Sequence, residues 1–158
     1  MRIAAVLAFA LAAAASAPAA LAYCIHNDLK DLAVAVAQDP NPDTRREGNE
    51  LKASIKPGGN ACCAYRNLDC NPDGKPLSVV DFSVKVAGEP AYLCGVPRGA
   101  RPGRVVKIPG DGIVRIQPNP RFDAKAKDAA LGTPYVVRVN GPDGKDIAGP
   151  AGLPCRQP

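Results

Sequence analysis

The sequence has no tryptophan, a single histidine, and none of the short motifs that usually mark a catalytic or metal site. There is no G-x-S-x-G nucleophile elbow, the arrangement that many serine hydrolases use. There is no C-x-x-C or H-x-x-x-H pair, so zinc lacks its usual ligand spacing. His26 lies near Asp28 and could act as a general base, but the sequence shows no serine or free cysteine for it to activate. The sequence therefore favours a non-catalytic protein without a cofactor, and His26 is interpreted as a surface or strand-end residue.

Long apolar runs are absent except at the N-terminus, where residues 3–15 are apolar and follow a single positive charge at Arg2. This run has the length of a signal-peptide core and is too short for a membrane-spanning helix. The Ala20-Leu21-Ala22 sequence has the small-x-small pattern of a cleavage site. We therefore expect a cleaved signal peptide over residues 1–22. Residues 23–158 are then expected to form a single exported domain with no transmembrane segment.

Cys24 follows this cleavage site and has two alternative roles. In a bacterial lipoprotein it would become the first, acylated residue of the mature chain. The residue before such a cysteine should be small, whereas here it is the bulky Tyr23. Lipidation would also leave five cysteines and therefore one unpaired thiol. We expect Cys24 to form a disulfide instead.

Six cysteines in an exported chain indicate three disulfides and a periplasmic or extracellular location. A bond between the adjacent Cys62 and Cys63 would strain the peptide that joins them. In a strand these two side chains point to opposite faces, so each is expected to have a different partner. Cys155 would hold down the C-terminal tail. The sequence leaves the pairing open among Cys24, Cys62, Cys63, Cys70, Cys94 and Cys155.

Proline and glycine are abundant, at 17 and 15 residues, and most of the chain alternates short apolar stretches with turn residues. Alternation of apolar and polar side chains predicts strands within residues 24–38, 49–59, 77–86 and 134–145. The alanines of the first stretch would also suit a short helix. The second of these ends at a Pro-Gly-Gly turn, and residues 60–68 are expected to be its antiparallel partner. Residues 38–49 have the composition of an exposed loop.

Two further elements are expected in the second half of the chain. Residues 104–116 resemble a hairpin that turns at Pro109-Gly110-Asp111-Gly112, whose glycines could supply a positive φ. Residues 119–132 are the best helix candidate, with Asp123 as N-cap and Gly132 as C-terminal stop. Together these patterns predict a mainly β fold: a small disulfide-stapled antiparallel β-sandwich or Greek-key barrel with at most one short helix.

The stretch DCNPDG resembles the first half of a calcium-binding loop. Asp69, Asn71 and Asp73 have the alternate spacing by which such loops direct oxygens at a hard cation. The second half is missing, because Val80 occupies the position of the bidentate glutamate. A tight turn over residues 71–74, with proline at its second position, is the simpler interpretation. A cation site at the three oxygen-bearing residues is the alternative.

The chain has a net charge of +5, and basic residues are concentrated between positions 98 and 128. If the hairpin forms, Lys107 and Arg115 could lie near each other across it. Such a patch could bind an anionic envelope component, such as an acidic glycan or a lipid phosphate, or it could be an ordinary solvated surface. Nucleic acid is not expected, because the chain is exported and only Phe122 in this segment could stack on a base. The candidate anion-binding residues are Arg98, Arg101, Arg104, Lys107, Arg115 and Arg121.

These observations predict a small exported β domain whose role is non-catalytic binding or structural. One alternative is a membrane-active or anion-binding β-sandwich that uses the basic region of residues 98–128. Another is a small secreted hydrolase with carboxylates that their spacing does not identify. The sequence identifies no ligand, partner or oligomeric state.

Overall fold

The computed structural model describes residues 22–39, 50–64, 66–99, 103–128 and 131–158. These residues form eleven β-strands, and no helix occurs among them. Residues 1–21 of the predicted signal peptide and residues 40–49 of the loop predicted over 38–49 lie outside the described residues. Gln38 is not part of an exposed loop, because it ends a strand and is buried. The strands are β1 (Ala22–Asn27), β2 (Val34–Gln38), β3 (Lys52–Ile55), β4 (Asn60–Ala64), β5 (Val79–Val86), β6 (Tyr92–Cys94), β7 (Val96–Pro97), β8 (Arg104–Pro109), β9 (Ile113–Pro118), β10 (Tyr135–Asn140) and β11 (Leu153–Arg156).

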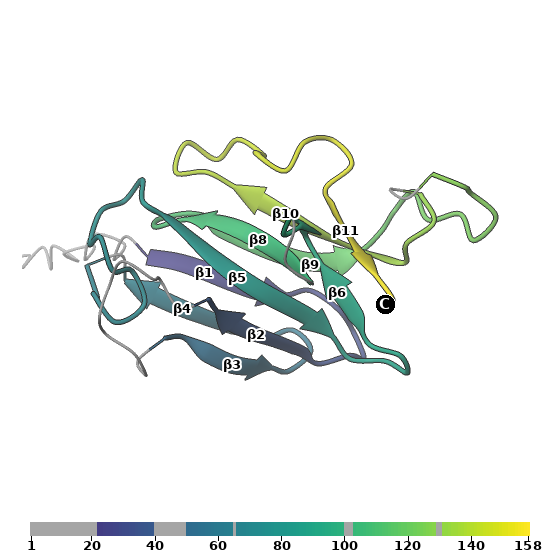
Figure 1. Ribbon diagram of the computed structural model, residues 1–158, viewed down its shortest axis with the longest axis horizontal. Helices are drawn as coiled ribbons and strands as arrows, with labels where there is room; N and C mark the ends of the chain where they lie inside the picture. Colours follow the sequence, from purple (N-terminus) through teal and green to yellow (C-terminus); the bar gives the residue numbers. More distant parts are fainter. Residues whose placement is uncertain (1–21, 40–49, 65, 100–102, 129–130) are drawn as a thin grey trace, which may run out of the picture.

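The strands build one nearly closed, barrel-like sheet (Figure 1). Its order is β3-β2-β5-β6-β11-β10-β9-β1-β4, and β8 pairs with β5 and β7 beside this path. β11 joins the two halves of the sheet, because its first residues pair with β10 and its last residues with β6. All pairs are antiparallel except β1 with β9. The predicted mainly β, disulfide-linked class is therefore confirmed.

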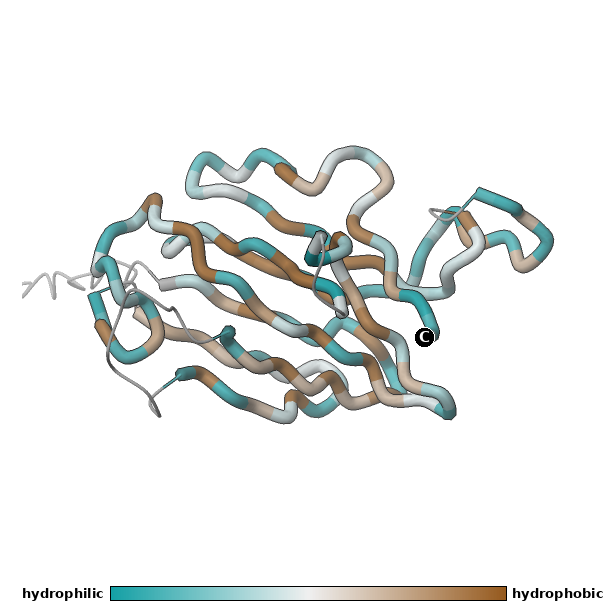
Figure 2. Tube along the Cα trace, in the orientation of Figure 1, coloured by the Kyte–Doolittle hydropathy of each residue, from teal (hydrophilic) through white to brown (hydrophobic). Residues whose placement is uncertain are grey.

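The core follows from the alternation of side chains along the strands. In β5, every second residue from Val80 to Val86 is buried, and Figure 2 shows hydrophobic and hydrophilic positions alternating along such strands. The largest buried side chains are aromatic: the rings of Tyr23 and Phe82 pack edge to face with their centroids 5.5 Å apart. The Tyr23 hydroxyl donates a hydrogen bond to the carbonyl oxygen of Cys70 (3.2 Å). Tyr23 therefore connects β1 both to the core and to the loop that follows β4.

All six cysteines are paired. Cys24 bonds to Cys62, Cys63 to Cys70, and Cys94 to Cys155. The expectation that the adjacent Cys62 and Cys63 have different partners is confirmed. The sulfur of Cys24 lies in a disulfide and so is not free to carry a lipid. Three disulfides indicate an oxidising, exported environment.

The partner predicted for β4 is wrong. β4 pairs with β1, in a register that places Cys62 opposite Cys24, whereas β3 pairs with β2. The Pro-Gly-Gly turn forms as expected, with the N–H of Gly59 donating to the carbonyl of Lys56 (2.9 Å). It connects the two open edges of the sheet instead of closing a hairpin. The apolar residues of β3 face those of β2, so burial decides the pairing against the nearest neighbour in sequence.

The hairpin predicted at residues 104–116 is also wrong, although both of its strands exist. β8 pairs with β5 and β7, and β9 pairs with β1 and β10. Neither Gly110 nor Gly112 has a positive φ. Gly110 is needed for a different reason: a Cβ there would lie 2.5 Å from Asn71 Nδ2 and from the carbonyl oxygen of Lys75. The segment is therefore a crossover that packs closely against the loop before β5.

The helix predicted over residues 119–132 does not form, because the described residues there adopt turns. The side chain of Asp123 accepts a hydrogen bond from the N–H of Lys125 (2.9 Å), the contact that an N-cap would make, but here it closes an isolated turn with no helix after it. The N–H of Asp123 donates to the carbonyl of Leu131 (2.9 Å). This alanine-rich stretch has no continuous apolar face to bury, which removes the main source of stability of a short helix. Within the described part of the chain, no helix is long and apolar enough to cross a bilayer.

Candidate functional site

An open groove of about 680 Å³ lies over β5, β7 and β8. We call it the β5–β8 groove. Its floor consists of side chains from these three strands. One wall is formed by residues 71–73, and the other by Gln38 and Asp39 at the end of β2. The groove therefore combines segments that are distant in sequence.

The apolar part of the groove is made of valines. Val79 alternates with the buried Val80 along β5 and so points outward, where its side chain is 58% exposed. Val96 of β7 is 40% exposed and lies opposite Val105 of β8 in the strand register. Covering such aliphatic surface is favourable by about 25 cal/mol for each Å² removed from water. The two exposed valines are therefore natural contact points for a ligand.

Arg98 crosses one end of the groove. Its guanidinium forms an ion pair with Asp39, and Nη2 lies 2.7 Å from Asp39 Oδ1 and 2.9 Å from Ser83 Oγ. The Ser83 hydroxyl in turn donates to Asp39 (3.2 Å). The side chains of Arg98 and Asp39 are each only 21% exposed, so this contact is better shielded from water than an ordinary surface pair. It ties the end of β7 to the end of β2 across β5.

A second ion pair lies on the floor. Lys107 Nζ is 3.0 Å from both carboxylate oxygens of Asp81. The two residues face each other in the register of β5 and β8. Both side chains are well exposed, so the pair adds little to stability. Its main effect is to place one positive and one negative charge side by side in the groove.

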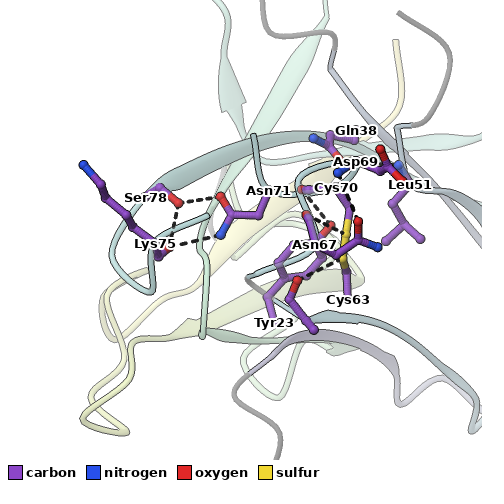
Figure 3. Close-up of a disulfide and its surroundings, with 11 residues drawn as sticks. Tyr23, Gln38, Leu51, Cys63, Asn67, Asp69, Cys70, Asn71, Lys75 and Ser78 are labelled. Atoms are coloured by element: carbon purple, nitrogen blue, oxygen red, sulfur yellow. Dashed lines mark hydrogen bonds between the residues drawn. A yellow bond between two sulfur atoms is a disulfide. The ribbon is translucent and has the colours of Figure 1, made fainter. Parts of the chain in front are cut away.

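The wall of residues 71–73 belongs to the turn predicted over residues 71–74, and the turn is confirmed. The N–H of Gly74 donates to the carbonyl of Asn71 (2.9 Å), and Gly74 has a φ of 62°. The Asn71 side chain is buried; its Nδ2 donates to the Lys75 carbonyl (3.0 Å) and its Oδ1 accepts the Ser78 hydroxyl (2.5 Å), as Figure 3 shows. These contacts fix the wall against the body of the protein.

The Cys63–Cys70 disulfide attaches the start of this wall to β4, as Figure 3 also shows. A cation site at Asp69, Asn71 and Asp73 stays a prediction. The Asn71 oxygen that such a site would use already accepts a hydrogen bond. Among the described residues, no group of three or more His, Cys, Asp or Glu side chains is placed to hold a metal ion.

The predicted basic residues are spread over several places. Arg98 and Lys107 line the groove. Arg104 donates from Nε to the carbonyl of Gly95 (2.7 Å), and burial, together with the nearby charge of Arg156, lowers its pKa. Arg104 therefore holds the chain at the junction of β6 and β7.

The other members of the basic set lie away from the groove lining. Arg115 of β9 pairs with Asp28 (3.0 Å), so the expected approach of Lys107 and Arg115 is wrong, because no hairpin joins their strands. Arg121 donates to the carbonyl of Pro150 (3.3 Å). Arg101 lies outside the described residues. Anion binding by the set stays a prediction. His26 lies near the end of β1 and is partly buried.

A second hollow of about 430 Å³ lies between the segment after β9 and the C-terminal strand. Its lining includes Tyr92 and Phe122, of which Phe122 is 47% exposed. It also includes Lys127 and Arg156. A carboxylate, that of Asp128, also lines this hollow. The two hollows therefore differ mainly in their apolar side chains, which are aromatic here and aliphatic in the β5–β8 groove.

Sequence reasoning missed Asp39, Ser83 and Val79 as site residues. The alternation of residues 77–86 places Val79, Asp81 and Ser83 on the outward face of a strand, and that pattern was the one available signal. It could not show that β8 lies beside β5. It also could not show that Arg98, 59 residues further on, reaches Asp39.

Comparison of the chain with protein-family models, with curated proteins and with solved structures finds no match in any of the three.

Proposed function

We propose that this chain is an exported, non-catalytic binding domain that holds its ligand in the β5–β8 groove. The observation that carries the proposal is the groove itself. It is the largest of the hollows described above, and it presents two exposed valines between fixed walls. Concave sites that combine apolar surface with a few positioned polar groups are typical of ligand binding. The predicted signal peptide and the three disulfides support a role in the periplasm or outside the cell.

The chemistry of the groove supports binding over catalysis. Its described lining contains neither histidine nor cysteine. Two of its carboxylates, those of Asp39 and Asp81, are held by Arg98 and Lys107. The Ser83 hydroxyl, which adjoins one wall, donates to a carboxylate and has no imidazole beside it. These groups suit recognition of a ligand by shape and charge more than proton transfer.

The proposal can be tested by screening a library of small polar and aliphatic fragments with ¹H–¹⁵N correlation spectra of the full exported chain. Chemical-shift changes should concentrate at Val79, Asp81 and Val96. Val79→Lys should abolish them, because it removes exposed apolar surface and fills the groove. Ile147→Lys is the matched control, since Ile147 is 57% exposed and lies outside the groove. Shifts that are absent from the groove, or that persist in Val79→Lys, would contradict the proposal.

The second hollow supports one alternative function, recognition of an anionic glycan or lipid headgroup. The observation that favours it is that two cations, Lys127 and Arg156, line this hollow together with Phe122, against one carboxylate, that of Asp128. Binding to vesicles of anionic lipid should then weaken as salt is added. Arg156→Gln should reduce it, whereas Lys107→Gln in the β5–β8 groove should not. Binding that is independent of salt would contradict this alternative.

A further inference from the structure

We infer that the β5–β8 groove recognises an extended peptide segment that carries a lysine or arginine beside aliphatic side chains. This inference rests on the proposed binding function of the groove and adds the class of ligand.

The first argument is the charge of the groove. Among the residues that the structure describes, its lining has three carboxylates and two cations, although the whole chain has a net charge of +5. Arg98 and Lys107 are already engaged by Asp39 and Asp81. The described part of the lining is thus locally acidic in a basic protein, which favours a cationic ligand over an anionic one.

Asp73 is the third carboxylate of the lining, the one that neither Arg98 nor Lys107 engages. It is exposed at the wall and forms no hydrogen bond or ion pair with a described residue. The sequence PDGK occurs twice, and the second copy places Asp143 in the equivalent position. There the carboxylate accepts the N–H of Lys145 (3.1 Å) and pairs with its ammonium group (3.0 Å). The same turn therefore satisfies its aspartate internally at residue 143 and leaves the aspartate at residue 73 open to a ligand.

The second argument is the kind of apolar surface. Val79 and Val96 offer aliphatic contacts, and none of the described lining side chains is aromatic. A nucleobase would find no ring on which to stack. Aliphatic side chains of a peptide, by contrast, can cover both valines.

The third argument is spacing and rigidity. Successive outward residues of β5, such as Val79 and Asp81, are separated by about 7 Å, the same period as alternate side chains of an extended peptide. A ligand with this period can lay an aliphatic side chain on Val79, and the open carboxylate of Asp73 on the wall attracts a basic residue of the same segment. The wall that carries Asp73 is fixed by the Asn71 hydrogen bonds and by the Cys63–Cys70 disulfide. A fixed wall reduces the ordering cost of binding.

The test is calorimetric titration of the full exported chain with three blocked pentapeptides, combined with the spectra described above. The first alternates valine and lysine, the second valine and glutamate, and the third serine and lysine. The valine–lysine peptide should bind in the groove, and each of the others should bind more weakly. Asp73→Asn should lower the affinity for the valine–lysine peptide by about twofold to fivefold, which corresponds to the loss of an exposed ion pair. Asp143→Asn, in the matched turn, should leave the affinity unchanged.

The outcomes separate the two proposals. Chemical-shift changes at the groove residues that are as large with the valine–glutamate peptide as with the valine–lysine peptide, or larger, would overturn the inference of a cationic ligand. They would leave the proposed binding function standing. An equal loss of affinity for the valine–lysine peptide in Asp73→Asn and Asp143→Asn would also overturn this inference. If neither these peptides nor the fragment library perturbs the groove, the proposed function fails as well.

Discussion

The disulfides allow a quantitative prediction, because they close loops of very different length. Cys94 and Cys155 are 61 residues apart, whereas Cys63 and Cys70 are 7 residues apart. All four residues are buried, so replacing either pair by serine removes a similar amount of core packing. The two variants therefore differ mainly in the entropy that the cross-link removes from the unfolded chain.

The loop-closure relation gives about 4 kcal/mol for the longer loop and about 2 kcal/mol for the shorter one. With a urea m-value of about 2 kcal/mol/M, the unfolding midpoint should fall by about 2 M and about 1 M, respectively. The Cys24–Cys62 bond, with a separation of 38 residues, should give a loss between these two values and nearer to the larger.

The measurement is urea unfolding of the three double-serine variants, followed by circular dichroism at one pH and temperature. Each curve is fitted with its own m-value, since an uncross-linked chain exposes more surface on unfolding. The loss in the free energy of unfolding in water should increase with loop length, so it should be smallest for Cys63→Ser/Cys70→Ser and largest for Cys94→Ser/Cys155→Ser. A loss for Cys63→Ser/Cys70→Ser that equals or exceeds the loss for Cys94→Ser/Cys155→Ser would refute this reasoning, because native-state contacts would then dominate the effect.

Two further predictions concern single residues. Burial raises the pKa of the Tyr23 phenol well above its ordinary value of about 10, so the unfolded chain loses this proton at a lower pH than the folded chain. The stability that the neutral, buried phenol contributes is therefore complete below about pH 10 and is lost as the pH rises further. Thermal unfolding followed between about pH 9 and about pH 11 should therefore show a smaller decline for Tyr23→Phe than for the unchanged chain, and equal declines would contradict this. Gly95 has a φ of 109°, and a Cβ there would lie within 2.2 Å of the Val105 carbonyl oxygen, so Gly95→Ala should lower the free energy of unfolding by at least about 2 kcal/mol in urea. Unchanged stability of Gly95→Ala would show that β7 can move away from β8 without cost.

Local patterns predicted the strands better than their partners. The alternation in residues 77–86 identified both the strand β5 and its buried face, because a half-buried strand must alternate. The even number of cysteines predicted the disulfides for a similarly local reason. Neither kind of pattern contains information on which strand lies beside which.

The errors arose where contacts distant in sequence outweighed local preference. β8 and β9 have the composition of a hairpin, yet each finds its apolar partners elsewhere in the sheet. Gly110 is explained by close packing against Asn71, which no local pattern could indicate. The groove was missed for the same reason, because it forms only when the ends of β2 and β7 meet across β5. The turn that carries Asp73 was predicted correctly, since it depends on its own four residues.

The adjacent positions of Cys62 and Cys63 also have a consequence for oxidative folding. Cys62 is exposed and Cys63 is buried, since they lie on opposite faces of β4. An exchange of partners between the two sulfurs would require β4 to slide by one residue against β1, which would bring a buried position to the surface. Isomers in which the neighbours have traded partners should therefore be unstable and should reshuffle until the register is correct. In this way the pairing of β4 with β1 favours the native cross-links over those in which Cys62 and Cys63 have traded partners.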